Sequence, residues 1–346
     1  MKKDTARANI VLVFVPGGMG SKLALGNDLV WSDGVQEYCS LRMLKNPSML
    51  LPWVPLNSPA ALTFYRSFIS FLGRRGYAEA KGNLVVWPYD WRISVEETGN
   101  KLNSDISSKL SGEFRGKKFI FICHSLGCMV VRWALLCSPG DIRGSVERVI
   151  AAAPPGLGIA SAFREMVQVT IGSTPLYATI LALIKYLSGY NIDIPIIRVS
   201  RSITSLLELL PPNFLPILTT GTGNQIGAFD WQGWPDELLA LRRSVLARQS
   251  TQASPPRNWG QIHRTLIASK QHPTESVYVL NANDSDIVSS LSEDGDDSVT
   301  FTSARAYMDL TTLQPVPPLD SEVLVASAHG DLLKEPGAQT EISKFI

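Results

Sequence analysis

Short apolar runs alternate with segments of helical periodicity over the first half of the chain. This alternation is typical of a mostly parallel sheet covered by helices on both faces. The runs that predict buried strands are Ala8–Val15, Asn83–Trp87, Lys118–Cys123 and Val146–Ala153. The segments with helical spacing are Ala60–Leu72, Val95–Leu110 and Leu126–Leu136. The pattern therefore predicts the α/β class.

The middle of the chain lacks strand patterns for about 120 residues. It contains a predicted helix at Asp236–Arg248. Pro235 at the start and two acidic residues in the first turn favour the beginning of a helix there. Strand patterns return at Ser276–Leu280 and Glu322–Ala326. We interpret the middle part as a helical cap inserted after the sixth strand equivalent of one core. The predicted division is core at 1–154, cap at 155–275 and core again at 276–346.

Two apolar segments could be taken for a transmembrane helix and a signal peptide. Met166–Ile184 approaches the length of a bilayer span, but Gly172–Pro175 interrupts any continuous helix there. Ile10–Val15 is too short for the apolar region of a signal peptide and leads directly into a glycine turn. We therefore expect a cytoplasmic protein, free or peripheral to a membrane.

Charge and cysteine usage narrow the classes of partner. The chain has 32 basic and 31 acidic residues, a formal charge of +1, so nothing favours a nucleic-acid partner. Its four cysteines show no paired or metal-like spacing, which favours reduced thiols. We expect neither a metal nor a cofactor.

The segment Cys123–Gly127, with sequence C-H-S-L-G, lies where a buried strand must turn sharply into a helix. A nucleophile elbow has this form, because it holds a serine on a strained turn between small neighbours. Gly127 satisfies the size requirement, whereas Cys123 stands where glycine is usual. The position between strand and helix predicts that Ser125 is a nucleophile.

Acyl transfer also needs two amides that stabilise an oxyanion. The amide of Leu126, at the start of the helix after Ser125, is the first candidate. The second is Gly18, or otherwise Met19, in the glycine loop Pro16–Ser21 after the first strand. This loop lacks the G-x-G-x-x-G spacing of a dinucleotide site.

A general base is expected after the last strand, since the chain order of such sites is serine, acid, histidine. His329 follows Glu322–Ala326 directly, whereas His124 should point away from Ser125 and the other two histidines, His263 and His272, fall in the predicted cap. The residues alone do not choose the orienting carboxylate. Its candidates are Asp284, Asp286, Asp294, Asp296, Asp297 and Asp331. The acidic stretch does not follow a calcium-loop pattern, so we expect no metal there.

Several segments together resemble the lecithin:cholesterol acyltransferase family. They are V-P-G-G-M-G-S at 15–21, W-P-Y-D-W-R at 87–92, H-S-L-G at 124–127, A-P-P-G at 153–156, E-D-G-D-D-S-V at 293–299 and H-G-D-L at 329–332. The resemblance implies an α/β-hydrolase fold with Ser125 as nucleophile, Asp296 as triad acid and His329 as base. It also implies oxyanion donors at Gly18 and Leu126.

The chain departs from this family in some respects. Cys123 replaces the usual elbow glycine, and Gly18 occupies a position that varies among members. The secretory signal and paired cysteines of the animal enzymes are missing from this sequence. Their role in lipoprotein metabolism is therefore not implied.

The substrate is predicted mainly from the resemblance, which favours an acyl ester of a lipid, such as a phospholipid. Met19, Trp53, Leu176 and Trp231 are candidate substrate contacts in an acyl-chain groove or at a bilayer, although apolar residues of this kind also simply pack a cap. The alternatives are an esterase, thioesterase or acyl-transfer enzyme for a soluble small molecule, and an inactive binding module. The last is disfavoured because every expected catalytic position is suitably filled.

Overall fold

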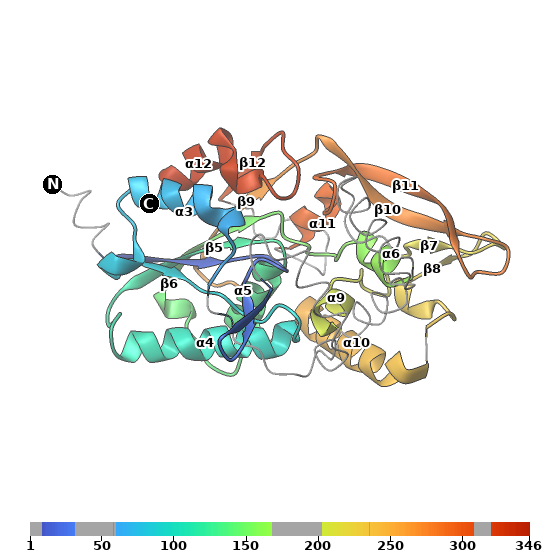
Figure 1. Cartoon of the computed structure of the whole chain (residues 1–346), viewed down its shortest axis with the longest axis horizontal. Helices are drawn as coiled ribbons and strands as arrows, with labels where there is room; N and C mark the ends of the chain where they lie inside the picture. The colour runs from blue at the N-terminus through green and yellow to red at the C-terminus, as the bar shows by residue number, and fades with distance from the viewer. Residues whose placement is uncertain (1–8, 32–57, 59, 168–202, 235, 308–319) are drawn as a thin grey trace.

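A computed structural model describes residues 9–31, 58, 60–167, 203–234, 236–307 and 320–346. Its centre is a six-stranded sheet in which every neighbouring pair is parallel (Figure 1). In spatial order the strands are β12 (Ser321–Leu324), β9 (His263–Ala268), β6 (Val146–Ala152), β5 (Lys118–His124), β1 (Ile10–Val15) and β4 (Leu84–Val86). The predicted mostly parallel sheet is confirmed.

Helices cover both faces of this sheet, so its central strands are apolar throughout. In β1, Val11, Val13 and Val15 face one cluster of buried side chains, while Leu12 and Phe14 face the other. In Figure 1 one pair of helices lies below the sheet and a second pair above it. The lower pair is α4 (Val95–Ser111) and α5 (Leu126–Leu136); the upper pair is α3 (Arg66–Arg74) and α12 (Pro336–Ser343).

A second, smaller sheet lies beside the first and carries the hairpin at the right of Figure 1. Its strands, in spatial order, are β11 (Ile287–Gly295), β10 (His272–Leu280), β7 (Leu218–Thr219) and β8 (Gln225–Ile226). The helices of this part are α6 (Ser161–Val167), α9 (Thr204–Glu208) and α10 (Leu239–Ala253). Phe163, Trp231, Trp234 and Tyr278 pack their rings together here.

The expectation that Ser276–Leu280 returns the chain to the main sheet is wrong. This segment belongs to β10, which pairs with β11 and β7 in the second sheet. The main sheet resumes earlier, at β9, which pairs with β6 inside the range predicted as cap. The apolar part of β9 is only Leu266–Ala268, too short to stand out in the sequence. A strand's own pattern also does not encode which sheet it joins.

The remaining elements are short. They are β2 (Leu23–Leu25), β3 (Asp28–Trp31), α11 (Phe301–Ala306) and the 3₁₀ helices η2 (Thr63–Tyr65), η3 (Glu79–Lys81), η4 (Arg143–Ser145), η5 (Ala228–Asp230), η6 (Asp236–Leu238) and η7 (Leu332–Lys334). Among the helices that the structure describes, none has both the length and the apolar composition needed to cross a bilayer.

Candidate active site

Ser125 occupies a strained turn between β5 and α5. Its backbone has φ 51° and ψ −128°, a region that residues with a side chain rarely adopt. Gly127 permits this turn, because a Cβ at that position would lie 2.3 Å from the Pro16 carbonyl oxygen. Cys123 fits without glycine, since its fully buried thiol donates to the Ile150 carbonyl at 3.6 Å. The geometry is that of a nucleophile elbow.

Three side chains distant in sequence meet at this turn. His329 Nε2 lies 2.9 Å from Ser125 Oγ, and His329 Nδ1 lies 3.0 Å from Asp296 Oδ2. His329 follows β12, whereas Asp296 follows β11 of the second sheet. Both sheets therefore contribute a residue to one hydrogen-bonded serine–histidine–aspartate arrangement.

Asp296 is buried, with 2% of its surface exposed, yet it is suited to carry a negative charge. Burial opposes ionisation, but His329 and the amides of Ser298 and Val299 outweigh it, and the pKa of Asp296 is lowered. The amide of His329 donates to the Asp296 carbonyl at 2.7 Å. Both the backbone and the side chain of Asp296 thus orient the histidine.

The proton positions on His329 follow from its partners. A carboxylate only accepts, so Nδ1 carries a hydrogen and Nε2 of the neutral ring accepts from Ser125. Burial lowers the pKa of His329. The charge and the hydrogen bond of Asp296 raise it by a larger amount, so the net shift of this pKa is upward. The arrangement is able to deprotonate a serine hydroxyl and to store the proton on the imidazole.

Two of the other candidate acids have partners elsewhere. Asp284 accepts from the amide of Gly221, and Asp331 forms an ion pair with Lys334. Asp297 adjoins Asp296 and has an exposed side chain, and partial desolvation together with the neighbouring charge raises its pKa. Among the six candidates, the structure brings the carboxylate of Asp296 into hydrogen bonding with the His329 ring.

The glycine loop after β1 lies against the start of α5. A Cβ at Gly18 would contact Leu126 Cδ2 at 3.4 Å, so the two predicted oxyanion positions are neighbours. The first amides of a helix have no acceptor within that helix, which leaves the Leu126 amide available to a ligand. Met19 adopts φ 58° in the same loop and packs, partly buried, against the core.

Residues from the W-P-Y-D-W-R segment hold this loop in place. The Tyr89 hydroxyl donates to the Pro16 carbonyl at 3.0 Å, and the Tyr89 amide donates to Ser21 Oγ at 3.1 Å. The Trp91 indole donates to the Ser21 carbonyl at 3.3 Å. The segment, which the sequence marks only through the resemblance, thus contacts both ends of the loop.

His124 points away from Ser125, as expected from its place in the elbow. Its ring nitrogens lie 2.9 Å from the Tyr65 hydroxyl and 2.9 Å from the His329 carbonyl oxygen. Tyr65 was not predicted to lie near the site, because nothing in a segment 59 residues away signals this contact.

The predicted substrate contacts are only partly described. Trp231 is 5% exposed, and its indole donates to the Asp284 carbonyl at 2.7 Å within the aromatic cluster of the second sheet. This environment accounts for Trp231 as packing, and substrate contact there stays a prediction. Trp53 and Leu176 lie outside the described residues.

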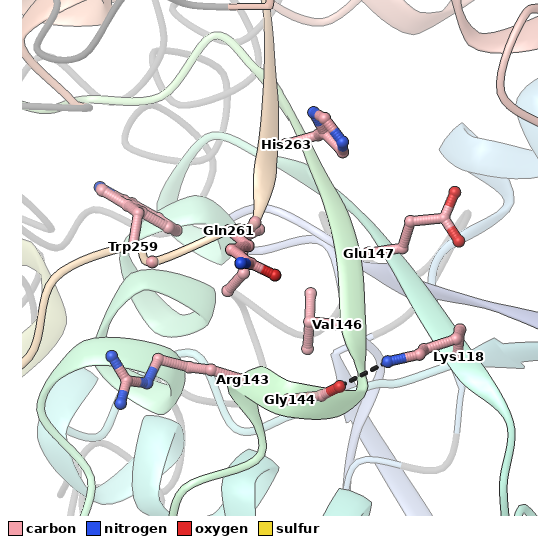
Figure 2. A pocket seen from close by; sticks show the side chains of 10 residues that line it. Lys118, Arg143, Gly144, Val146, Glu147, Trp259, Gln261 and His263 are labelled. Carbon is pink, nitrogen blue, oxygen red and sulfur yellow. Dashed lines mark hydrogen bonds between the residues drawn. The ribbon is translucent and has the colours of Figure 1, made fainter.

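A surface cavity of about 410 Å³ lies at the opposite edge of the main sheet, at the amino ends of β5, β6 and β9 (Figure 2). Lys118 begins β5 and Ser125 follows its end, which separates them by roughly 20 Å. Lys118 donates to the Gly144 carbonyl at 2.6 Å, and His263 pairs with Asp320. Because ligands of open α/β sheets bind at the carboxyl ends of the strands, this cavity is not the candidate active site.

The described cysteines Cys123, Cys128 and Cys137 are free thiols, and Cys39 lies outside the described residues. Within the described ranges, no group of three or more His, Cys, Asp or Glu side chains is arranged to hold a metal ion.

Comparison of the sequence with models of protein families finds a match. A family model described as Lecithin:cholesterol acyltransferase matches residues 57–240, just over half of the chain. The matched part includes Ser125 and ends before Asp296. No curated protein sequence was found to match the chain.

Solved structures resemble the chain in fold. The crystal structure of the Tle4-Tli4 complex matches with a TM-score of 0.66 at 11% identity, over 95% of this chain and 96% of the other. The mature lipase BlEst2 of Bacillus licheniformis matches with a TM-score of 0.44 at 12% identity, over 97% and 89%. Phospholipase PlaB of Legionella pneumophila matches with a TM-score of 0.34 at 13% identity, over 85% and 45%. The first of these likenesses supports the fold alone, and the predicted α/β-hydrolase fold is confirmed.

Proposed function

Because the chain belongs to the lecithin:cholesterol acyltransferase family, we propose that it is a serine acyl hydrolase or acyltransferase acting on a lipid ester. One observation carries the proposal: Ser125 Oγ, His329 and Asp296 form a continuous hydrogen-bonded series with distances of 2.9 and 3.0 Å. A serine is a weak nucleophile until an adjacent base removes its proton, and this series supplies that base.

The proposed reaction begins with attack of Ser125 Oγ on the ester carbonyl. His329 Nε2 takes the hydroxyl proton, and Asp296 stabilises the imidazolium that forms. Collapse of the tetrahedral intermediate breaks the ester bond, and His329 returns the proton to the leaving alcohol. The product of this half-reaction is an acyl-Ser125 intermediate.

The amides of Gly18 and Leu126 are the proposed oxyanion donors. Their support is the proximity of Gly18 to Leu126 and the position of Leu126 at the start of α5. The partial positive charge at a helix N-terminus stabilises the negative oxygen that develops there. Removal of one such donor typically costs about 10²–10³ in rate.

The second half-reaction returns the enzyme to its free form. Water or an alcohol attacks the acyl-Ser125 carbonyl, with His329 again accepting the proton. The bond between the acyl carbon and Ser125 Oγ then breaks, and His329 returns the proton to Ser125 Oγ. Water yields a fatty acid, whereas a lipid alcohol yields a new ester. Membership of a lipid-acting family supports a phospholipid or another long-chain acyl ester as the acyl donor, and peripheral contact with a membrane is part of this proposal.

We also propose a domain organisation, which is based on the pairing of the strands. The predicted cap, 155–275, contains α6, α9, α10, β7 and β8, but it also contains β9 of the main sheet. We therefore propose that the cap comprises the segment between β6 and β9 together with the β10–β11 hairpin, which pairs with β7. In this arrangement Asp296 belongs to the cap and hydrogen-bonds to His329 of the core.

Labelling with a fluorophosphonate probe tests the proposed nucleophile. We expect the wild-type protein to be labelled and Ser125→Ala to remain unlabelled, because the probe reacts only with an activated serine. Ser107→Ala, which alters an exposed serine of α4, is the matched control and should label like the wild type. Equal labelling of Ser125→Ala and wild type would refute the assignment.

A comparison of two substrates tests the proposal that the enzyme acts on a lipid ester. Fatty-acid release from phosphatidylcholine vesicles is measured beside hydrolysis of a soluble short-chain p-nitrophenyl ester. The proposal expects release from vesicles that Ser125→Ala abolishes. Turnover of the soluble ester without release from vesicles would instead support an esterase for a small molecule.

A further inference from the structure

Two buried polar side chains lie behind the proposed nucleophile and take no part in the proposed chemistry. Tyr65 ends η2 and is 4% exposed; His124 ends β5 and is 5% exposed. Burying a polar side chain lowers the stability of the fold unless all of its hydrogen bonds are formed. Their partners therefore indicate what these two residues do.

The partners of His124 determine where its proton lies. Nε2 lies 2.9 Å from the carbonyl oxygen of His329, which only accepts, so Nε2 carries the hydrogen. In a neutral ring Nδ1 is then an acceptor, and the Tyr65 hydroxyl at 2.9 Å donates to it. The Tyr65 oxygen in turn accepts from the amide of Gly17 at 2.9 Å. Three hydrogen bonds thus run in one direction from Gly17 to His329.

The surroundings of His124 keep its ring neutral, as this direction requires. Burial, and then the neighbouring His329, lower the pKa of His124 to about 3. Lys334 acts in the same sense, while Asp296 and the hydrogen bond to the His329 carbonyl oppose it. A neutral His124 adds no positive charge beside the proposed base, whose ring centroid lies 4.9 Å away.

The two ends of this series are parts of the proposed catalytic machinery. Gly17 precedes Gly18, the proposed oxyanion donor, and His329 is the proposed base. The fit is close at the first end, because a Cβ on Gly17 would lie 3.0 Å from His124 Nδ1 and 3.2 Å from the Tyr65 oxygen. A Cβ on Gly20 would lie 2.9 Å from Tyr65 Cε2. The Tyr65 ring therefore packs directly against the glycine loop Pro16–Ser21, named the oxyanion loop below for the role proposed for Gly18.

We propose that Tyr65 and His124 are positioning residues that fix the oxyanion loop at Gly17 relative to the backbone of His329. The inference rests on the proposed function for the roles of the two ends. Acyl transfer requires the base and the oxyanion donors to be placed together around Ser125, and a displacement of about 1 Å costs on the order of 10² in rate. Through this series, the distance between loop and base is set by side chains rather than by chain connectivity.

The first test is independent of catalysis. In Ser125→Ala protein with ¹⁵N-labelled histidine, imidazole NMR shifts report the protonated nitrogen of each of the four histidines. We expect the His124 signals, identified by their loss in His124→Asn, to show a neutral ring with hydrogen on Nε2 from pH 5 to 8. Titration of His124 near its ordinary pKa, or hydrogen on Nδ1, would overturn the proposal whatever Ser125 does.

The second test measures positioning. Tyr65→Phe removes the central hydroxyl, so we expect fluorophosphonate labelling per folded molecule to slow about 10- to 100-fold with KM for a soluble ester nearly unchanged. His124→Gln, which can still donate to the His329 carbonyl, should be less impaired than His124→Leu. Tyr278→Phe is the matched control, because its hydroxyl donates to Glu275 at 2.8 Å in the second sheet, and it should label normally.

The outcomes separate the two proposals. Wild-type labelling by folded Tyr65→Phe contradicts the positioning role while leaving Ser125 in place. Absence of labelling in the wild type contradicts the proposed function, and the NMR result on His124 is then still decisive for its tautomer and neutrality.

Discussion

At the scale of single residues, electrostatics around His329 governs the expected chemistry. Asp296 raises the pKa of His329 by its charge and its hydrogen bond, against the effect of burial. The neutral imidazole is the active form of the proposed base, so activity should be lost as pH falls through this raised pKa. The same pair stabilises the fold where Asp296 is ionised, and that contribution is lost as pH falls through the lowered pKa of Asp296.

The pH profile of kcat/KM tests this coupling. For the wild type we expect one ascending limb with its midpoint above the ordinary histidine value of 6.5. Asp296→Asn should lower the midpoint and reduce the rate by roughly 10⁴, because the histidine loses its orienting charge. Asp297→Asn is the control: Asn tolerates the φ of 78° there, and the rate should change only a few-fold. A normal profile in Asp296→Asn would contradict the role of Asp296.

At the scale of elements, the close approach of α5 to the end of β1 shapes the nucleophile elbow. A Cβ on Gly127 would lie 2.3 Å from the carbonyl oxygen of Pro16 and 2.6 Å from that of Val15. Any side chain at this position must move the helix or the strand. The elbow and the glycine loop after β1 are therefore one packed unit.

A pair of glycine substitutions tests this contact. Gly127→Ala should reduce the free energy of unfolding by about 1–3 kcal/mol or more, because backbone atoms have to shift. Gly73→Ala, in α3, meets nothing within 4 Å and should increase it by about 0.5–1 kcal/mol through the better helix propensity of alanine. Urea unfolding measures both. Similar stability of the two variants would exclude the close approach.

At the scale of the whole molecule, a buried carboxyl joins the proposed cap to the core. Glu208 of α9 accepts from the amide of Val95 at 2.6 Å, at the start of α4, and contacts Arg248 of α10. The ion pair favours ionisation of Glu208 and burial opposes it. Burial is the larger effect, and the pKa of Glu208 rises from 4.5 to about 7.

The sign of this shift predicts how stability depends on pH. Since the folded pKa lies above the unfolded one, the contribution of Glu208 is complete below pH 4.5 and is lost as pH rises to about 7. The loss is on the order of 3 kcal/mol. Glu208→Gln should flatten this part of the stability profile, measured by urea unfolding between pH 4.5 and 8. The exposed Glu113→Gln should keep the wild-type slope, and an equal slope in Glu208→Gln would rule out the assignment.

Much of the architecture was predictable because its signals are local. β1, β5 and β6 appear in the sequence as apolar runs bounded by turns, and they lie side by side within the main sheet. The apolar run of α5 forms a buried helix that follows β5. The small size of Gly127 marks the elbow, and the fixed order of serine, acid and histidine limits the choice of base. These features depend on steric rules that act within a few residues.

The tertiary structure decided what depends on partners far apart in the chain. It assigned β10 to the second sheet and β9 to the first, because pairing partners are not written in a strand's own pattern. Among six aspartates it brings Asp296 to His329, 33 residues away, where the residues alone left the choice open. It also joined Tyr65, His124 and His329 across gaps of 59 and 205 residues. Local sequence determines which elements form and where a nucleophile can stand, but hydrogen-bond partners are selected only when packing brings distant segments within about 3 Å.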